Sequence, residues 1–509
     1  MPIGAEFDLN VRGTIPAGAE GTLLVATSRR LKDRSTFRRW HDSQAELLRL
    51  DVRSGSPGRV TARLLDIDPS GADVGYSWPA TVPRDQYYHY VTQPNHAVNV
   101  SGNHAWTTNL LFGAPLEIDL EAFRATRVLT SFPTTRDAPQ RSSTAHFAWS
   151  LDRRYAYYHQ SLLQRETETS NVRSTSLQLL ELDSVTGRER AWGVVAPDED
   201  PSDESANFHS AFYFEEGGRR FVGLLRTGAV LQQLEPHDGA DDHAVCRLPF
   251  STIWIVEVVD GQRELKASVL PGLGDLKGIA LSHLEVDNTS RDGFVLYANY
   301  KQADVAEETH GINVYGESPD KVREHYSGAV TEPVNFGTVL RYERRGGRST
   351  VAVFSRPYDF ERTSLGHSWM PINIQLDSSK RRLFCSFAGF KPRLLPRHIV
   401  AAYLDLAADY SAIRFVPPAL LRLDARTLEL DHQSDRSHIS YSEPIAFTLI
   451  AGDDAKDYIV TFSTENGLRF YDADDLTRIL AYASSARLHT WRDSHLRPEP
   501  AHIVHARLA

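Results

Sequence analysis

The chain has 509 residues, and its 56 basic and 66 acidic side chains give a formal net charge of −10. Without a basic excess to neutralise phosphates, a nucleic-acid partner is not expected. No apolar run reaches the roughly 18–20 residues that a membrane-spanning helix needs. The first residues lack the basic and apolar segments of a secretory signal, and two cysteines cannot build a disulfide framework. These features predict a cytoplasmic globular protein.

Short runs rich in β-branched and aromatic residues follow one another along the whole chain and are typical of β-strands. The clearest runs are 21–27, 45–52, 176–183, 252–259, 294–300, 338–342, 351–355, 382–387 and 458–463. They are bounded by Gly, Asp, Asn or Pro and do not alternate with helical segments. This pattern argues against a doubly wound α/β sheet and predicts an all-β fold.

A loose repeat, in which a strand ending in LxLD runs into a polar turn, occurs at 48–51, 180–183 and 421–424. A strand–turn unit that recurs through an all-β chain is typical of the outer hairpin of a propeller blade, with a pair of β-sandwiches as the alternative. Residues 397–415 break the β pattern, because Ala, Leu and Ile recur there at near-helical spacing after Pro396. We expect this segment to form a helix or helical loop on one face of the β body.

Several common enzyme signatures are absent from the sequence, among them GxSxG, GxxxxGK[ST] and HExxH. Histidine is frequent, with 20 residues, and four lie in strand-like or strand-edge apolar contexts: His146, His209, His283 and His505. Neutral imidazole is a common metal ligand, and histidines from separate blades can converge on a propeller axis. From these contexts alone, a structural role as a hydrogen-bonded histidine is more common than a role as a metal ligand. The metal site is therefore one of two interpretations of these four residues.

Eight short motifs, in order along nearly the whole chain, resemble those of one family. They are VRGTIP with GTLL at 11–24, RRWHD at 38–42, GAPLEID at 113–119, TAH at 144–146, FHSAF at 208–212, SHLE at 282–285, PIN at 371–373 and SEPI at 442–445. The chain thereby resembles the carotenoid cleavage oxygenases, which include carotenoid, apocarotenoid and stilbene-cleaving dioxygenases and the retinoid isomerohydrolase.

The resemblance implies a seven-bladed β-propeller that forms a single domain over residues 1–509. Together with the helical pattern at 397–415, it predicts a propeller with a helical or loop cap on one face. It also implies a non-haem Fe(II) on the propeller axis, held by His146, His209, His283 and His505. Four neutral imidazoles can leave coordination positions open for O2 and substrate. Glu443 resembles a family glutamate that hydrogen-bonds a ligand imidazole and so orients it.

The sequence departs from the family pattern at several places. Phe112 stands where the family has one further glutamate, and either Trp369 or Met370 stands where it has another. Leu111 stands where the stilbene-cleaving branch has a lysine. The family's His-Asp-Phe reads His-Ser-Ala at 209–211. Near the C-terminus, His502 is a rival to the fourth ligand, three residues before the favoured histidine.

The resemblance implies an iron-dependent dioxygenase that cleaves a C=C bond of a hydrophobic conjugated alkene, such as a polyene or apocarotenoid, with O2 to carbonyl products. One alternative keeps the iron site but catalyses isomerisation or another non-cleaving reaction. Another is a propeller that serves as a non-catalytic binding scaffold. An apolar patch within 394–404 could touch a membrane surface, with packing on the propeller face as the alternative.

Overall fold

The computed structural model describes residues 6–29, 44–67, 97–108, 115–129, 140–165, 172–197, 208–226, 229–233, 243–247, 252–273, 280–301, 336–354, 368–390, 416–434, 446–452, 456–463, 467–488 and 499–506. Nearly all of its elements are β-strands, which confirms the all-β prediction. The helical segment predicted at 397–415, and with it the cap and the apolar patch, lies outside the described residues. Among the described residues, no helix is long and apolar enough to cross a membrane.

Most of the strands form antiparallel four-stranded units, whose strands are named from the innermost outward. Unit 1 contains β32 (Glu499–Ala506), β2 (Gly21–Arg29), β3 (Gln44–Arg53) and β4 (Arg59–Ile67). Unit 2 contains β5 (Ala97–Ser101), β6 (His104–Thr108), β7 (Leu116–Asp119) and β8 (Arg124–Val128). Unit 3 contains β10 (Ala148–Trp149), β11 (Tyr155–Arg165), β12 (Val172–Asp183) and β13 (Glu189–Val195), and β9 (Gln140–Ser143) pairs with its β11.

Four further units are found among the described residues. Unit 4 contains β14 (Phe208–Glu216), β15 (Arg219–Arg226), β18 (Thr252–Glu257) and β19 (Glu264–Val269), with a separate hairpin of β16 (Ala229–Gln233) and β17 (His243–Arg247) between its second and third strands. Unit 5 contains β20 (Ala280–Asp287), β21 (Gly293–Lys301), β22 (Phe336–Arg345) and β23 (Arg348–Phe354). Unit 6 contains β24 (Ser368–Leu376), β25 (Arg382–Phe390), β26 (Val416–Asp424) and β27 (Leu430–Gln433). Unit 7 contains β28 (Ala446–Ala451), β29 (Asp457–Ser463), β30 (Gly467–Asp472) and β31 (Ile479–Ser484).

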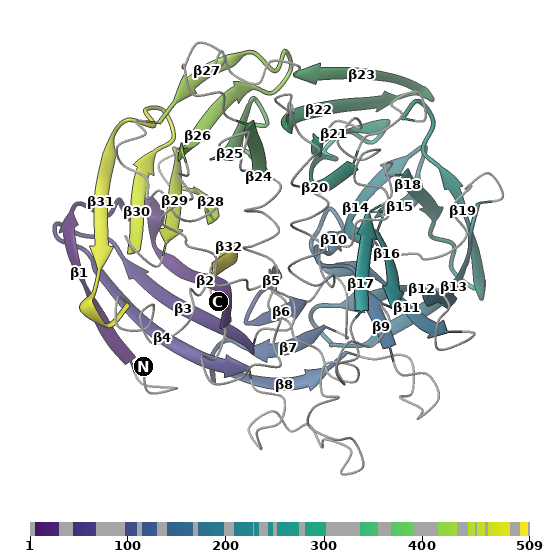
Figure 1. The fold of residues 1–509 in the computed structure, drawn as a ribbon, viewed down its shortest axis with the longest axis horizontal. Coiled ribbons are helices and arrows are strands. Elements are labelled where there is room, and N and C mark those ends of the chain that lie inside the picture. Colours follow the sequence, from purple (N-terminus) through teal and green to yellow (C-terminus); the bar gives the residue numbers. More distant parts are fainter. Residues whose placement is uncertain are drawn as a thin grey trace, which may run out of the picture.

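The units are arranged in a ring, with their first strands around the centre and their fourth strands at the rim (Figure 1). Strands from both ends of the chain meet in this ring. β1 (Glu6–Gly13) pairs with β31 of unit 7 and with β4 of unit 1, and the 3-10 helix η1 (Ala17–Ala19) then leads into β2. β32, near the C-terminus, pairs with β2. Because strands from both ends of the chain enter the same sheets, this pairing ties the last unit to the first.

The LxLD repeat marks the third strand of units 1, 3 and 6, so it belongs to the outer hairpin as predicted. In unit 3 the Asp183 carboxylate accepts hydrogen bonds from the backbone N–H groups of Val185 and Thr186, at 2.9 and 3.0 Å. Asp424 of unit 6 does the same with Arg426 and Thr427, at 2.9 and 2.7 Å. An aspartate that satisfies the N–H groups of the following turn explains why this residue ends these strands.

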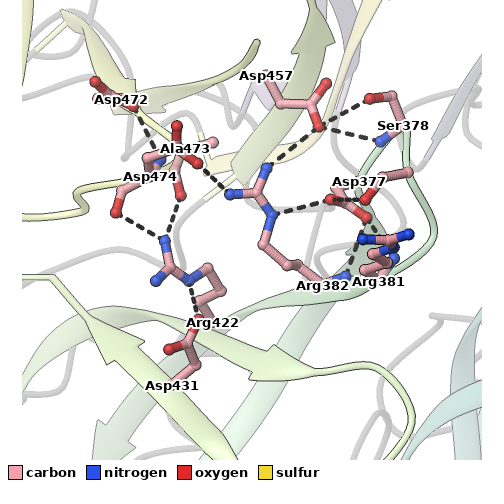
Figure 2. Close-up of polar contacts among 11 residues, drawn as sticks. Asp377, Ser378, Arg381, Arg382, Arg422, Asp431, Asp457, Asp472, Ala473 and Asp474 are labelled. Carbon is pink, nitrogen blue, oxygen red and sulfur yellow. Dashed lines mark hydrogen bonds and ion pairs between the residues drawn. The ribbon is translucent and has the colours of Figure 1, made fainter. Parts of the chain in front are cut away.

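Units are joined by apolar clusters between their faces and by ion pairs at the turns. Figure 2 shows one such cluster between units 6 and 7, in which Arg382 contacts Asp377 at 2.9 Å, Asp457 at 3.6 Å and Asp474. Arg422 adds a hydrogen bond to the carbonyl of Ala473 at 2.9 Å. Burial raises the pKa of Asp377, but hydrogen bonds from neighbouring groups, Arg382 included, outweigh it and hold that pKa below its usual value. This cluster fixes the two units against each other.

Candidate functional site

Three of the four predicted histidines meet at the centre of the ring. His146 precedes β10, His209 is the second residue of β14, and His283 lies in β20, so they come from three consecutive units. Their ring centroids are 5.3, 5.3 and 4.8 Å apart, and one potential ligand nitrogen from each lies within 4.8 Å of the others. His209 is buried, and the other two are partly buried. This arrangement can hold a metal ion.

Two of these histidines lie at irregularities in their strands. The register of β14 against β15 shifts between Phe208 and Ser210, and that of β20 against β21 shifts between Leu281 and Leu284. A β-bulge re-aims the side chains beside it and is common next to functional sites. The bulges therefore help to turn His209 and His283 toward the centre.

A backbone clamp holds the segment that carries His146. Asn99 of β5 donates a hydrogen bond from Nδ2 to the carbonyl of Ala145 at 3.0 Å, and its Oδ1 accepts one from the N–H of Phe147 at 2.8 Å. The Thr108 hydroxyl donates to the same Ala145 carbonyl at 2.8 Å. His146 lies between the two clamped groups, so its position is fixed without a regular strand at that residue.

The His146 and His209 segments are also bonded directly to each other. The N–H groups of Ala145 and His146 donate to the carbonyl of His209 at 3.0 and 3.2 Å, and Ala211 N–H donates to the carbonyl of His146 at 2.9 Å. Nδ1 of His209 lies 3.0 Å from Oγ of Ser210. If Nδ1 donates to this hydroxyl, Nε2 is left with its lone pair for a metal. Ser210 thus supplies the kind of partner that orients a ligand imidazole, at one of the positions where the sequence departs from the family.

His505 lies near the end of β32 and lines the same central cavity, but it is not part of the three-histidine group. Its Nε2 is 2.9 Å from the backbone carbonyl of Glu20. The ring lies against Gly21, where a Cβ would come within 2.3 Å of Nε2. As a fourth ligand His505 stays a prediction. Glu443 and Phe112 lie outside the described residues, as do the side chains of His502 and Trp369.

A cavity of about 1270 Å³ occupies the centre of the ring. All seven units contribute to its wall, and Gly102 and Arg153, which belong to turns after innermost strands, show that it extends toward the side of those turns. Glu285, two residues after His283, also lines it. Burial raises the pKa of Glu285 to about 7, against the effect of Lys380 and of the Leu376 N–H. The histidine group therefore adjoins a large, mixed polar and apolar cavity.

The sequence interpretation missed two further residues beside the histidines. Asn99 is one, since its clamp depends on a contact between units. His159 in β11 is the other: its side chain is fully buried, its Nδ1 is 2.7 Å from the Thr144 hydroxyl, and burial lowers its pKa to about 3, so the ring is neutral. A histidine inside a Tyr-rich strand is the signal that could have identified it, but sequence alone does not show which residues it meets.

Comparison with known proteins bears on the fold. No protein-family model matches the sequence, and no curated protein matches it significantly. Among solved structures, a variant of Synechocystis apocarotenoid oxygenase is similar with 14% identity and a TM-score of 0.56, over 100% of this chain and 97% of that one. The lignostilbene dioxygenase of Pseudomonas brassicacearum is similar with 13% identity and a TM-score of 0.57, over 95% and 93%. The chain has the carotenoid cleavage oxygenase fold. The β-propeller that the motifs implied is thereby confirmed.

A third similar structure is a cobalt-substituted Synechocystis apocarotenoid oxygenase, with 14% identity and a TM-score of 0.56, over 100% of this chain and 97% of that one. Cobalt substitution of that protein means that one member of this fold accepts the metal. In the present chain, the histidine group places three imidazoles at the centre of the same fold.

Proposed function

We propose that this protein is a non-haem Fe(II) oxygenase that cleaves a C=C bond of a hydrophobic, conjugated alkene with O2 and releases two carbonyl products. One observation carries the proposal: His146, His209 and His283 converge from three consecutive units at the centre of a fold shared with an apocarotenoid oxygenase and a lignostilbene dioxygenase. The proposed mechanism and substrate class are those that the motif resemblance implies.

The donor set fits such an ion. The group consists of imidazoles, with no carboxylate or thiolate among its members, so a bound divalent ion keeps its positive charge. Imidazole nitrogen suits first-row metals such as iron and binds at about 2.0–2.2 Å. When bound, iron would supply the one-electron route by which triplet O2 reacts with an alkene.

The described residues supply position and enclosure. The Asn99 clamp and the bonds between the His146 and His209 segments hold the backbone at two of the three histidines in place before a ligand arrives, which lowers the cost of ordering the site. The cavity wall includes apolar side chains such as Phe147, Leu284 and Ile374, which can orient an extended apolar substrate and exclude water from it.

The test begins with metal analysis of protein purified without O2, followed by O2 uptake with apocarotenoid and stilbene substrates and mass spectrometry of the carbonyl products. His146→Ala, His209→Ala and His283→Ala should each lose iron and activity. His432→Ala is the matched control, because that side chain contacts Asp475 at 3.3 Å far from the group. His505→Ala decides whether a fourth imidazole contributes. Wild-type protein that takes up no stoichiometric iron or cobalt would refute the metal site.

A further inference from the structure

His159 connects to the segment that carries His146 through a single residue, Thr144. Nδ1 of His159 lies 2.7 Å from the Thr144 hydroxyl, which also accepts a hydrogen bond from the His159 backbone N–H at 3.0 Å. In the opposite direction, the Thr144 N–H donates to the carbonyl of His159 at 3.3 Å. Both side chains are fully buried, so these bonds do not compete with water. The position of Thr144, two residues before His146, is thus tied to the imidazole.

The same imidazole packs against the segment that carries His209. The rings of His159 and Phe208 are 4.7 Å apart at 73°, and Phe208 directly precedes His209. Phe208 also contacts Trp254, whose ring is 5.0 Å away at 65°. Edge-to-face contacts of this kind have a preferred geometry and do not slide freely. One side chain therefore touches both segments that lead into the histidine group.

Packing alone does not account for a histidine at this position. Burial of an imidazole costs desolvation energy, and Nε2 of His159 is buried without a hydrogen-bond partner among the described residues. A leucine would fill the space beside Phe208 without that cost, but it would leave the Thr144 hydroxyl without its bond to the ring. The gain specific to histidine is the link between the two segments.

We propose that His159 is a positioning residue, which holds His146 and His209 at the separation that a metal ion requires. The backbone bonds from Ala145 and His146 to the His209 carbonyl set the distance on one side, and the Thr144–His159–Phe208 contacts set it on the other. The inference rests on the proposed metal-binding function. It concerns this chain's own scaffold and requires no contact between His159 and the ion.

The test uses Co(II) titrated into chelator-treated full-length protein, with cobalt absorption giving the dissociation constant and the shape of the spectrum. His159→Leu and Thr144→Val should each weaken Co(II) binding by about 10–100-fold, the range for groups that orient metal ligands. Thr144→Ser, which keeps the hydroxyl, should retain wild-type affinity within about 3-fold. The double variant should lose no more than either single one, because both changes break one link.

Tyr157→Phe is the matched control, because Tyr157 lies on the same strand and the same face as His159. The substitution removes a 2.7 Å hydrogen bond to Glu181 but does not affect the contacts of Thr144. It should bind Co(II) like wild type. Circular dichroism of each metal-free variant shows whether it is folded. Folded His159→Leu and Thr144→Val proteins with wild-type affinity and spectrum would overturn the inference, as would equal losses in Thr144→Ser and Thr144→Val. If His159→Leu does not fold, the threonine pair decides. Failure of wild type to bind Co(II) would refute the proposed function, and the inference with it.

Discussion

Replacement of Asn99 by leucine tests how the scaffold holds His146. The change keeps the branched shape of the side chain and its number of heavy atoms, and it removes both ends of the clamp. The carbonyl of Ala145 keeps the Thr108 hydroxyl as a donor at 2.8 Å, so that loss amounts to one hydrogen bond, about 0.5–1.5 kcal/mol. The N–H of Phe147 loses the acceptor at 2.8 Å, and leaving such a buried group unpaired costs about 1–3 kcal/mol.

Together these terms predict that Asn99→Leu lowers the free energy of unfolding by about 2–4 kcal/mol. Because His146 lies between the two freed groups, we also expect Co(II) affinity to fall by about 10-fold, the lower end for partners that orient metal ligands. Urea unfolding of the metal-free protein and cobalt titration measure the two effects separately.

Thr108→Val is the control for this prediction. It removes a donor to the same Ala145 carbonyl but leaves the Phe147 N–H paired with Asn99, so it should cost about 1 kcal/mol and change Co(II) affinity by less than about 3-fold. If Asn99→Leu is within about 1 kcal/mol of wild type, or if the two variants lose the same affinity, the clamp does not position His146.

Three more predictions concern the ring and the ion. Arg382→Met should lower the free energy of unfolding by about 2–4 kcal/mol at neutral pH, because it leaves the buried carboxylates of Asp377 and Asp457 without their cation. Arg59→Met is the control at an exposed ion pair, and it should lower the free energy of unfolding by less than about 1 kcal/mol in the same urea assay. Because the folded-state pKa of Asp377 is lowered, its carboxylate stabilises the fold above the ordinary aspartate pKa, and this stabilisation is lost as the pH falls through the folded-state value. The difference in unfolding free energy between wild type and Arg382→Met should therefore become smaller in acid. Gly21→Ala should destabilise the protein in thermal unfolding, because its Cβ would lie 2.3 Å from Nε2 of His505 at a φ of +138°. Bound Co(II) should be released as the pH is lowered to about 4–5, because an imidazole must be deprotonated to bind a metal. Loss of the cobalt absorption spectrum measures this release.

The fold could be predicted from the sequence because its strands carry local signals. Runs of β-branched and aromatic residues indicated strand positions, and the aspartate that ends β12 and β26 marks a turn through bonds to its own next residues. Pairing between distant segments has no such local signal. The joining of β1 to both β31 and β4 depends on tertiary packing, so sequence patterns could suggest closure of the ring but not its register.

The histidine group was predictable in part for the same reason. The order and flanking residues of His146, His209 and His283 pointed to them, and the structure brings these three together. The bulges that aim His209 and His283 involve two strands each, so a single run of residues does not reveal them. The bond from His505 to the Glu20 carbonyl joins opposite ends of the chain and was likewise beyond sequence reasoning.

The Asn99 clamp has a counterpart elsewhere in the ring, where the bracketed residue is not a histidine. Gln375 of unit 6 donates to the carbonyl of Phe447 at 3.3 Å and accepts from the N–H of Leu449 at 2.8 Å, so it brackets Thr448 as Asn99 brackets His146. Both bracketed residues line the central cavity. An amide side chain that links neighbouring units beside the cavity is therefore a structural feature of the ring and does not depend on a histidine. The metal binding that we propose depends on the residue held between the two clamped groups, which is an imidazole at His146 and a hydroxyl at Thr448.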